Sequence, residues 1–332
     1  MLPPDWKKLS TEHFGNPLLE QRRLLEQKAY VKRSDQTVLE IQGPDSLSWL
    51  HSLTSQNILN LKPGDSTESL LLTPNGHIEQ QLKLIVTDTG AFVIVHQDKA
   101  SALVEWLNKM RFRSKVEVLE RSELSCFGAF ADLSNLGPIW KDPWSIPSAS
   151  SVSYNPDRKQ FFWHEVISQD PPVLERAGLM AYHALRIATG RPEITDVDDR
   201  TLPHEFDWLN SAVHLSKGCY RGQETVSKVH NLGHPPRRLA ILNLEQGDMI
   251  AASGDEVSYQ EKVIGKVVAA GLHFEEGSIA LAILNRNTPY LDLIVRSGES
   301  QIAATQEVLV PHDAGKAANL PRPSAFKLSS KK

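Results

Sequence analysis

One short segment of this 332-residue chain combines a cysteine, two cations and two glycines. Residues 216–224 read Ser-Lys-Gly-Cys-Tyr-Arg-Gly-Gln-Glu, so that Lys217 and Arg221 flank Cys219. A helix is expected from Gln223 to His230, just beyond the cysteine. Nearby cations and a helix N-terminus both favour the thiolate over the thiol. This spacing therefore predicts a reactive thiol at Cys219, with a small buried packing residue as the alternative.

The other residues of this segment would support the thiol. Lys217 and Arg221 would tune its ionisation, and Gly218 and Gly222 permit backbone conformations or close approaches that a Cβ would forbid. The positions that complete the predicted turn and the start of the helix are Tyr220, Gln223 and Glu224.

Two other kinds of thiol site have weaker support. His230 and His234 stand four positions apart, but a zinc site would usually supply a cleaner set of ligands and spacings, so no firm metal site is predicted. A cysteine hydrolase would need a histidine base with Asn210 or Asn231 as its orienting group, and spacing alone assigns neither partner.

The composition restricts the classes of function. The net charge is −4, from 36 basic and 40 acidic residues, which argues against nucleic acid, RNA included, as the main partner. The two cysteines exclude a disulfide framework and fit a reducing cytoplasm. Cys126 lies in the apolar run 125–131 and is predicted to be an inert core residue. The N-terminus lacks a signal-peptide core and no run is long enough to span a membrane, so a cytoplasmic protein is expected.

Local charge varies strongly along the chain. Five cations and one acidic residue lie between His214 and Arg238, a balance of +4 that favours an anionic ligand. A solvated helix face is the alternative, and RNA binding would show itself by a steep salt dependence. The acidic stretch with Asp196, Asp198 and Asp199 lacks the glycine and the distant glutamate of an EF-hand, so a solvated acidic loop is expected there.

The first two thirds of the chain alternate between strand-like and helix-like patterns. Alternating runs on both sides of Asp88-Thr89-Gly90 predict a hairpin. Pro44 is expected at the first position of one helix, Asp98 as the N-cap of another, and Val173 to Thr189 as the helix with the clearest pattern. Strands and helices in this order predict antiparallel α+β layers.

From Leu239 onward the pattern changes to short β-forming runs separated by turns, which predicts a small barrel of about six strands. The runs cover 239–244, 256–259, 262–270, 278–284, 291–296 and 301–310. The expected organisation is a peripheral segment (1–27), an α+β region (28–236), the barrel (237–312) and a disordered tail (313–332).

The eight residues from Lys217 to Glu224 resemble the signature of the YgfZ family of folate-binding proteins. These proteins are relatives of the glycine-cleavage T-protein, the tetrahydrofolate-dependent aminomethyltransferase. Four more stretches resemble the family, in the expected order: Leu-Thr-Pro-Asn-Gly-His-Ile (72–78), Leu-Arg-Ile-Ala-Thr-Gly-Arg-Pro (185–192), Leu-Pro-His-Glu (202–205) and Val-His-Asn-Leu-Gly-His-Pro-Pro-Arg-Arg (229–238). The resemblance covers roughly residues 30 to 310.

The resemblance implies a fold and a ligand. The fold would have three modules arranged as a ring around a central channel: two discontinuous α+β parts, which make up the folate-binding region 28–236, and a C-terminal antiparallel β-barrel. The bound ligand would be tetrahydrofolate, a pterin joined to an anionic glutamate tail. Arg186, Arg237 and Arg238 are then candidates for binding the tail, and Trp208 and Tyr220 for stacking on the pterin.

The resemblance also implies a function. It predicts a folate-binding protein that supports the assembly or repair of iron–sulfur enzymes, with Cys219 acting as a thiolate or a transient metal ligand. Client proteins or assembly machinery would be the partners, and tRNA modification would be affected downstream. The alternative is a folate-dependent aminomethyltransferase or another one-carbon transferase. Two departures weigh against the alternative: Ala188 stands where the T-protein pattern has a glutamate, and Asp98 does not match the position of its acidic residue.

Overall fold

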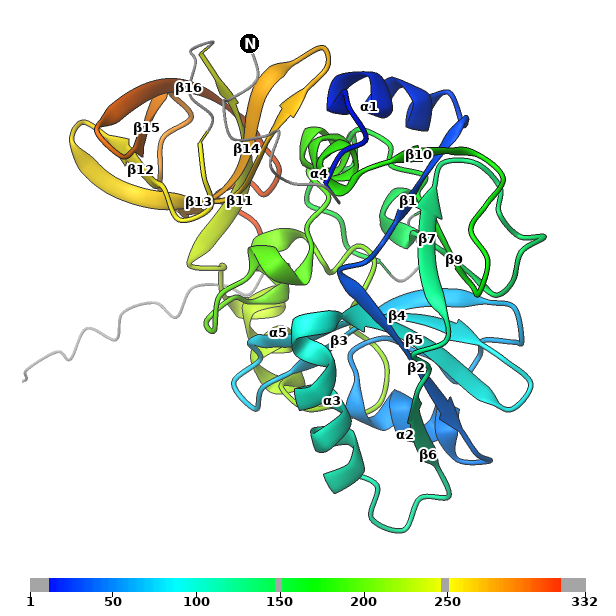
Figure 1. Cartoon of the computed structure of the whole chain (residues 1–332). Helices are drawn as coiled ribbons and strands as arrows, with labels where there is room; N and C mark the ends of the chain where they lie inside the picture. Colours follow the sequence, from blue (N-terminus) through cyan, green and yellow to red (C-terminus); the bar gives the residue numbers. More distant parts are fainter. Residues whose placement is uncertain (1–11, 147–150, 246–250, 318–332) are drawn as a thin grey trace, which may run out of the picture.

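The computed structural model describes residues 12–146, 151–245 and 251–317, so parts of the predicted peripheral segment and of the predicted tail lie outside the described residues. The described chain contains two five-stranded sheets and a closed six-stranded barrel (Figure 1). In Figure 1 the barrel, coloured yellow to red, and the sheet that contains β2 to β6 lie at opposite ends of the molecule. The predicted α+β class with a C-terminal barrel is confirmed.

The first sheet has the strand order β3-β4-β5-β2-β6. Successive side chains of a strand face opposite sides, so Leu39 and Ile41 pack in one cluster with α2 and α3, whereas Val38 faces the core shared with the second sheet. The hairpin predicted at 88–90 is confirmed, with Val86 opposite Ala91. The elements of this module are β2 (Gln36–Gln42), α2 (Ser46–Leu53), β3 (Ser66–Leu72), β4 (Ile78–Val86), β5 (Gly90–His96), α3 (Gln97–Lys109) and β6 (Glu117–Glu120).

The second sheet has the strand order β10-β1-β7-β9-β8. Because β1 belongs to it and β2 to the first sheet, the chain passes between the two modules more than once. Cys126 on β7 is only 2% exposed, and burial raises the pKa of its thiol well above the ordinary value, so the core role predicted for it is confirmed. The elements are α1 (Pro17–Leu25), β1 (Ala29–Lys32), β7 (Ser125–Ala129), β8 (Ile139–Lys141), β9 (His164–Ser168), β10 (Glu175–Ala177) and α4 (Leu179–Ala188).

Three predicted helix starts are wrong. Helix α4 begins at Leu179 rather than Val173, because residues 175–177 form β10, which pairs in parallel with β1. The N-cap of α3 is His96, whose Nδ1 accepts a hydrogen bond from the Asp98 backbone, and Asp98 lies in the first turn. Pro44 precedes α2, whose N-cap is Asp45. Pairing with β1 accounts for the later start of α4, whereas the other two signals lie within two residues of the observed N-caps.

The barrel closes through the strand order β11-β14-β13-β12-β15-β16. Along β11, Ala240 and Leu242 belong to the barrel's own core, whereas Leu239 and Ile241 join the large core that contains α4. One strand therefore serves two cores, as the alternation of its side chains allows. The six strands are β11 (Arg237–Leu244), β12 (Glu256–Tyr259), β13 (Lys262–His273), β14 (Gly277–Asn285), β15 (Leu293–Ser297) and β16 (Ser300–Val308).

Buried ions join the two sheets. Arg33, which follows β1, donates to Glu165 on β9 and to Glu193 at 2.7 Å. Lys83 on β4 donates to both carboxylate oxygens of Glu165 at 2.8 Å. All four side chains are nearly inaccessible to solvent. Removing one member would leave an uncompensated buried charge, which costs about 3–5 kcal/mol, so this cluster fixes the relative position of the sheets.

The acidic stretch after α4 is not the solvated loop that its composition predicts. Arg186 donates to both carboxylate oxygens of Asp196 at 2.7 and 2.9 Å, and Asp196 is only 4% exposed. Asp198 pairs with Arg237 at 2.7 Å. The prediction failed because the partners of these carboxylates come from α4 and β11.

Within the described residues, no helix is long and apolar enough to cross a membrane.

Candidate functional site

Cys219 lies on the loop that precedes α5 (Gln223–Leu232), and its side chain is exposed. Two residues of the loop, Lys217 and Tyr220, are 7% exposed and anchor it to the protein. The amide of Gln223 donates to the Lys217 carbonyl at 3.2 Å and closes the loop on itself. The thiol is therefore presented to solvent by an anchored segment.

Lys217 fixes the loop to the end of α2. Its Nζ donates to the backbone carbonyls of His51, Thr54 and Gln56, the last at 3.2 Å. A lysine at a helix C-terminus satisfies free carbonyls and complements the helix dipole. Burial lowers the pKa of Lys217 to about 8. Since its ammonium is committed to α2, the predicted tuning of Cys219 by Lys217 has no contact to support it.

Arg221 is also committed elsewhere. Its guanidinium donates to Glu79 at 2.8 and 3.4 Å and lies 5.6 Å from the centre of the Trp106 ring. Glu79 and Trp106 line a cavity of about 450 Å³ that also contacts Asp198. Sequence reasoning missed Glu79 and Trp106, because nothing in their local pattern links β4 and α3 to the cysteine loop.

The surroundings of position 222 leave no room for a Cβ and so require glycine, whereas those of position 218 do not. Gly222 has a φ of 83°, and a Cβ at this position would lie 2.5 Å from the Thr73 carbonyl oxygen and 2.9 Å from the Gly76 Cα. A Cβ on Gly218 would meet nothing within 4 Å. The structure thus brings together the turn at 72–78 and the cysteine loop, the two stretches whose glycines the sequence had singled out.

Helix α5 begins where predicted and ends at Leu232, two residues beyond His230, with Gly233 as its C-cap. Glu224 is exposed in its first turn. Beneath α5, His204 is 0% exposed and neither of its ring nitrogens makes a hydrogen bond of normal geometry. Burial and the nearby His230 lower the pKa of His204 to about 3, so its ring is neutral at pH 7.

The residues predicted to hold a folate occupy separate, mostly buried environments. Arg186 forms a bidentate ion pair with Asp196, and Arg237 pairs with both Asp198 and Glu205. Trp208 is 0% exposed and stacks on the ring of Phe206, with ring centres 5.6 Å apart. In this conformation Trp208 and Arg237 have no free surface or free charge for a pterin or a glutamate tail.

Arg238 and Tyr220, the other two predicted ligand residues, are buried as well. Arg238 lies on β11 at 0% exposure, and Tyr220 packs beneath the cysteine loop with the Lys217 ammonium 5.1 Å from its ring centre. The structure therefore does not gather the five arginine and aromatic candidates into one pocket with Cys219.

A cavity of about 400 Å³ lies between α4 and the barrel. Its lining combines the Arg186–Asp196 pair and His183 with the apolar surface of β13 at Val268–Leu272. Burial and the Arg186 cation lower the pKa of His183 to about 4. An apolar slot with a few convergent polar groups is typical of a small-molecule site.

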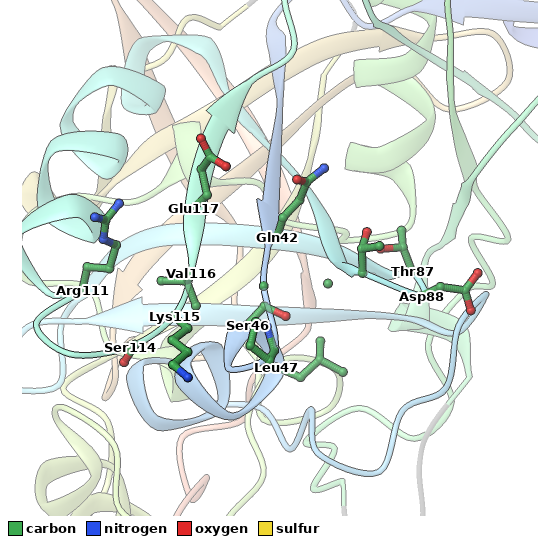
Figure 2. Close-up of a pocket in the computed structure, with 14 residues that line it drawn as sticks. Gln42, Ser46, Leu47, Thr87, Asp88, Arg111, Ser114, Lys115, Val116 and Glu117 are labelled. Carbon is green, nitrogen blue, oxygen red and sulfur yellow. The ribbon is translucent and has the colours of Figure 1, made fainter.

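A larger cavity of about 780 Å³ lies far from these residues, where the loops before α2, between β4 and β5 and after α3 meet. Figure 2 shows Ser46, Thr87, Asp88 and Arg111 among the residues around it. None of the predicted site residues lines it. In the part of the chain that the structure describes, no group of three or more His, Cys, Asp or Glu side chains could hold a metal ion.

The fold is that of the glycine-cleavage aminomethyltransferases. The crystal structure of aminomethyltransferase T from Bartonella henselae matches with a TM-score of 0.68 at 17% identity, over 92% of this chain and 95% of that one. No family model matches the sequence. The YgfZ assignment and the central channel therefore remain predictions.

Three curated proteins are similar in sequence. A chloroplastic protein of Arabidopsis thaliana named "Putative transferase" is 24% identical over 73% of this chain and 62% of its own length. The aminomethyltransferase of Rippkaea orientalis is 27% identical over 74% and 75%. The mitochondrial iron–sulfur cluster assembly factor IBA57 of Mus musculus is 27% identical over 63% and 60%. The chain thus spans less than two thirds of the plant and mouse proteins.

Proposed function

We propose that this chain binds tetrahydrofolate and supports the assembly or repair of iron–sulfur enzymes, with Cys219 as the group that reacts or transiently binds metal. The observation that carries the proposal is the exposed thiol on an anchored loop. Free cysteines are among the most buried residues, so an exposed one held in place by Lys217 and Gly222 suits chemistry or a partner rather than packing. The sequence similarity to the mouse iron–sulfur cluster assembly factor also supports the proposed iron–sulfur role.

The chemistry available at Cys219 is that of a single thiolate. A thiolate is both nucleophile and metal ligand, and iron–sulfur clusters are commonly held by four cysteine thiolates. One thiol on a solvent-facing loop can supply one of these ligands during transfer. Client proteins or assembly machinery would supply the rest, and are the proposed partners.

The folate is proposed to bind in the cavity between α4 and the barrel. Asp196 would accept from the N–H donors of the pterin ring, Arg186 would hold the Asp196 carboxylate in place, and His183 would remain neutral beside it. Tetrahydrofolate, when bound, could supply a carrier for one-carbon units or act as an allosteric ligand. The T-protein resemblance and the shared fold support this ligand class.

A calorimetric titration with tetrahydrofolate tests the folate site. Ala269 on β13 lines the cavity beside α4, and Ala102 on α3 lines the cavity beside Arg221, so the substitutions Ala269→Trp and Ala102→Trp fill one cavity each. We expect Ala269→Trp to weaken binding at least about tenfold, since a filled cavity excludes the ligand, and Ala102→Trp to leave it unchanged. Absence of binding to the unsubstituted protein would refute the folate proposal.

A one-carbon transferase is the second candidate, favoured by the fold and by the similarity to the Rippkaea orientalis aminomethyltransferase. The structure places Ala188 in the core at the end of α4 and Asp98 on the exposed first turn of α3. A turnover assay with tetrahydrofolate and aminomethyl donors separates the two candidates. Product formation would favour the transferase, and stoichiometric binding without product would favour the iron–sulfur role.

We also propose a cytoplasmic location and an indirect effect on tRNA modification through an iron–sulfur enzyme. The plant and mouse relatives are named as chloroplastic and mitochondrial, so cell fractionation is the direct test of location. For the second point, the levels of modified nucleosides in tRNA would fall in cells that lack the chain.

A further inference from the structure

The basic loop (residues 110–116) joins α3 to β6 and lies at the lower end of the molecule in Figure 1. Its sequence, Met-Arg-Phe-Arg-Ser-Lys-Val, contains three cations and no acidic residue. All three side chains are exposed, and within the described residues none forms an ion pair: Arg111, Arg113 and Lys115. The loop therefore presents three uncompensated charges to solvent.

The basic segment 214–238 does not do the same, although its sequence has more cations. Lys217 and Arg238 are buried, and Arg221 and Arg237 pair with carboxylates. Of its five cations, Lys228 alone is exposed. A chain with a net charge of −4 can bind a polyanion only where free cations gather. In the folded protein this condition is met by the basic loop rather than by 214–238.

Phe112, in the middle of the basic loop, is unusual in two respects. It is 82% exposed, and its backbone φ is 41°. A bulky side chain at positive φ is an outlier, and such strain concentrates at functional sites. Because the ring contributes little packing to the fold, neither its exposure nor its backbone is explained by the chain itself.

The backbone of the basic loop is held at both ends. The indole N–H of Trp49 donates to the Met110 carbonyl at 3.1 Å. The backbone N–H of Lys115 donates to a carboxylate oxygen of Asp45 at 2.7 Å. Both partners belong to the start and middle of the α2 region, so the loop is fixed to the module while its ring and charges face solvent.

The basic loop also forms one wall of the cavity of about 780 Å³. In Figure 2, Arg111 and Glu117 lie on one side of this cavity, and Gln42, Thr87 and Asp88 lie on the other. Oγ1 of Thr87 is buried without a hydrogen-bond partner. Amide, hydroxyl and carboxylate groups can pair with the donors and acceptors at the edge of a nucleobase, whereas carboxylates oppose contact with an anionic membrane.

We propose that the basic loop and this cavity bind single-stranded nucleic acid. Phe112 stacks on one base, the three cations of the loop contact phosphates, and the cavity admits an unpaired base. Aromatic stacking beside a positively charged track is the usual way in which proteins bind single strands. The site goes beyond the proposed function, because it contains none of the residues assigned to the thiol or to the folate.

Fluorescence anisotropy with a labelled oligouridylate of about twelve nucleotides tests the proposal. The unsubstituted protein should bind it, with log affinity falling against log salt at a slope of about −2, because each phosphate contact contributes about −0.7. Phe112→Ala should weaken binding about five- to hundredfold and leave the slope unchanged. Arg113→Met should weaken binding and reduce the slope by about 0.7.

Two substitutions elsewhere serve as matched controls. Phe162→Ala removes another exposed phenylalanine, and Lys228→Met removes the exposed cation of the segment 214–238. Both should leave the affinity within about twofold of the original. Since the side chains of Phe112 and Arg113 are also exposed, all four variants should fold, which urea unfolding would check.

Three results would overturn the proposal: no binding of the oligonucleotide, unchanged affinity of Phe112→Ala, or equal affinity for an abasic oligonucleotide of the same length and charge. Vesicles of phosphatidylcholine and phosphatidylserine separate a membrane from a nucleic acid. Binding to vesicles without binding to the oligonucleotide would make the loop a membrane contact and refute the site. Cys219→Ala should leave the oligonucleotide affinity unchanged, so failure of the iron–sulfur role would not affect this result.

Discussion

The backbones of Gly76 and Gly222 touch, so closely that a Cβ on Gly222 would lie 2.9 Å from the Gly76 Cα. The turn between β3 and β4 thereby buttresses the loop that presents Cys219. Gly76 faces the same constraint from the other side, since its own Cβ would lie 2.9 Å from the Thr225 Cβ on α5. The position of the thiol therefore depends on a contact between the first α+β module and α5.

The two glycines that flank Cys219 should differ sharply when substituted. Gly222→Ala should destabilise the protein by about 1–3 kcal/mol or more, because the residue has a positive φ and no space for a Cβ. Gly218→Ala should be nearly neutral, since its Cβ would meet nothing. Urea unfolding of both variants checks this. Equal effects would show that the loop is not held as described.

Lys217→Met should weaken folding rather than alter the thiol. It removes the ammonium that donates to three carbonyls at the end of α2, and we expect a loss of about 2–4 kcal/mol. Lys228→Met, on the exposed face of α5, is the matched control. If Lys217→Met kept full stability but slowed the reaction of Cys219 with a disulfide reagent, the tuning role predicted from sequence would be correct after all.

His204→Leu should change how stability depends on pH. The pKa of His204 is about 3 in the folded protein and about 6.5 when unfolded, so the unfolded state binds more protons between these values. Stability is therefore lost as the pH falls from 6.5 towards 3, by about 2 kcal/mol at pH 5 from this residue alone. The leucine variant should lack this loss.

The measurement for His204 is the difference between the two unfolding free energies at pH 7, 6 and 5. Other buried groups, such as Asp207, whose pKa burial raises to about 6, titrate in both proteins and cancel. A difference that stays constant over this range would contradict a buried neutral histidine beneath α5.

The two cysteines should react at very different rates. Cys219 is exposed, whereas Cys126 is buried and its thiol donates to Glu165 at 3.7 Å. Titration of the native protein with a chromogenic disulfide should therefore modify one thiol quickly and the second only on unfolding. Two fast thiols, or none, would be inconsistent with the structure.

Local patterns predicted much of the fold. The hairpin at Asp88-Thr89-Gly90, the start of α5 and the strands of the barrel depend on turn residues and alternation within a few positions. The predicted start of α4 was wrong because β10 forms only by pairing with β1, and no local sequence pattern indicates that pairing.

For the candidate site too, the sequence predicted the local features and missed the contacts between distant elements. The sequence singled out Cys219 and the glycine turns, which the structure brings together, but it proposed Arg186 and Arg237 as ligands of a folate tail although both are paired with carboxylates. Their partners, Asp196 and Asp198, lie in a stretch that composition alone described as a solvated loop. A net local charge is a sum over residues that are adjacent in the sequence. These ion pairs join residues of different elements, so the sum did not reveal them.

The proposed role of Cys219 is tested most directly in cells that lack this chain. The activity of an iron–sulfur enzyme is measured after complementation with the unsubstituted chain, with Cys219→Ala, or with Ser216→Ala as an exposed control on the same loop, at equal protein levels. We predict that Ser216→Ala restores the activity and that Cys219→Ala leaves it at the level of cells without the chain. Full restoration by Cys219→Ala would contradict the central claim.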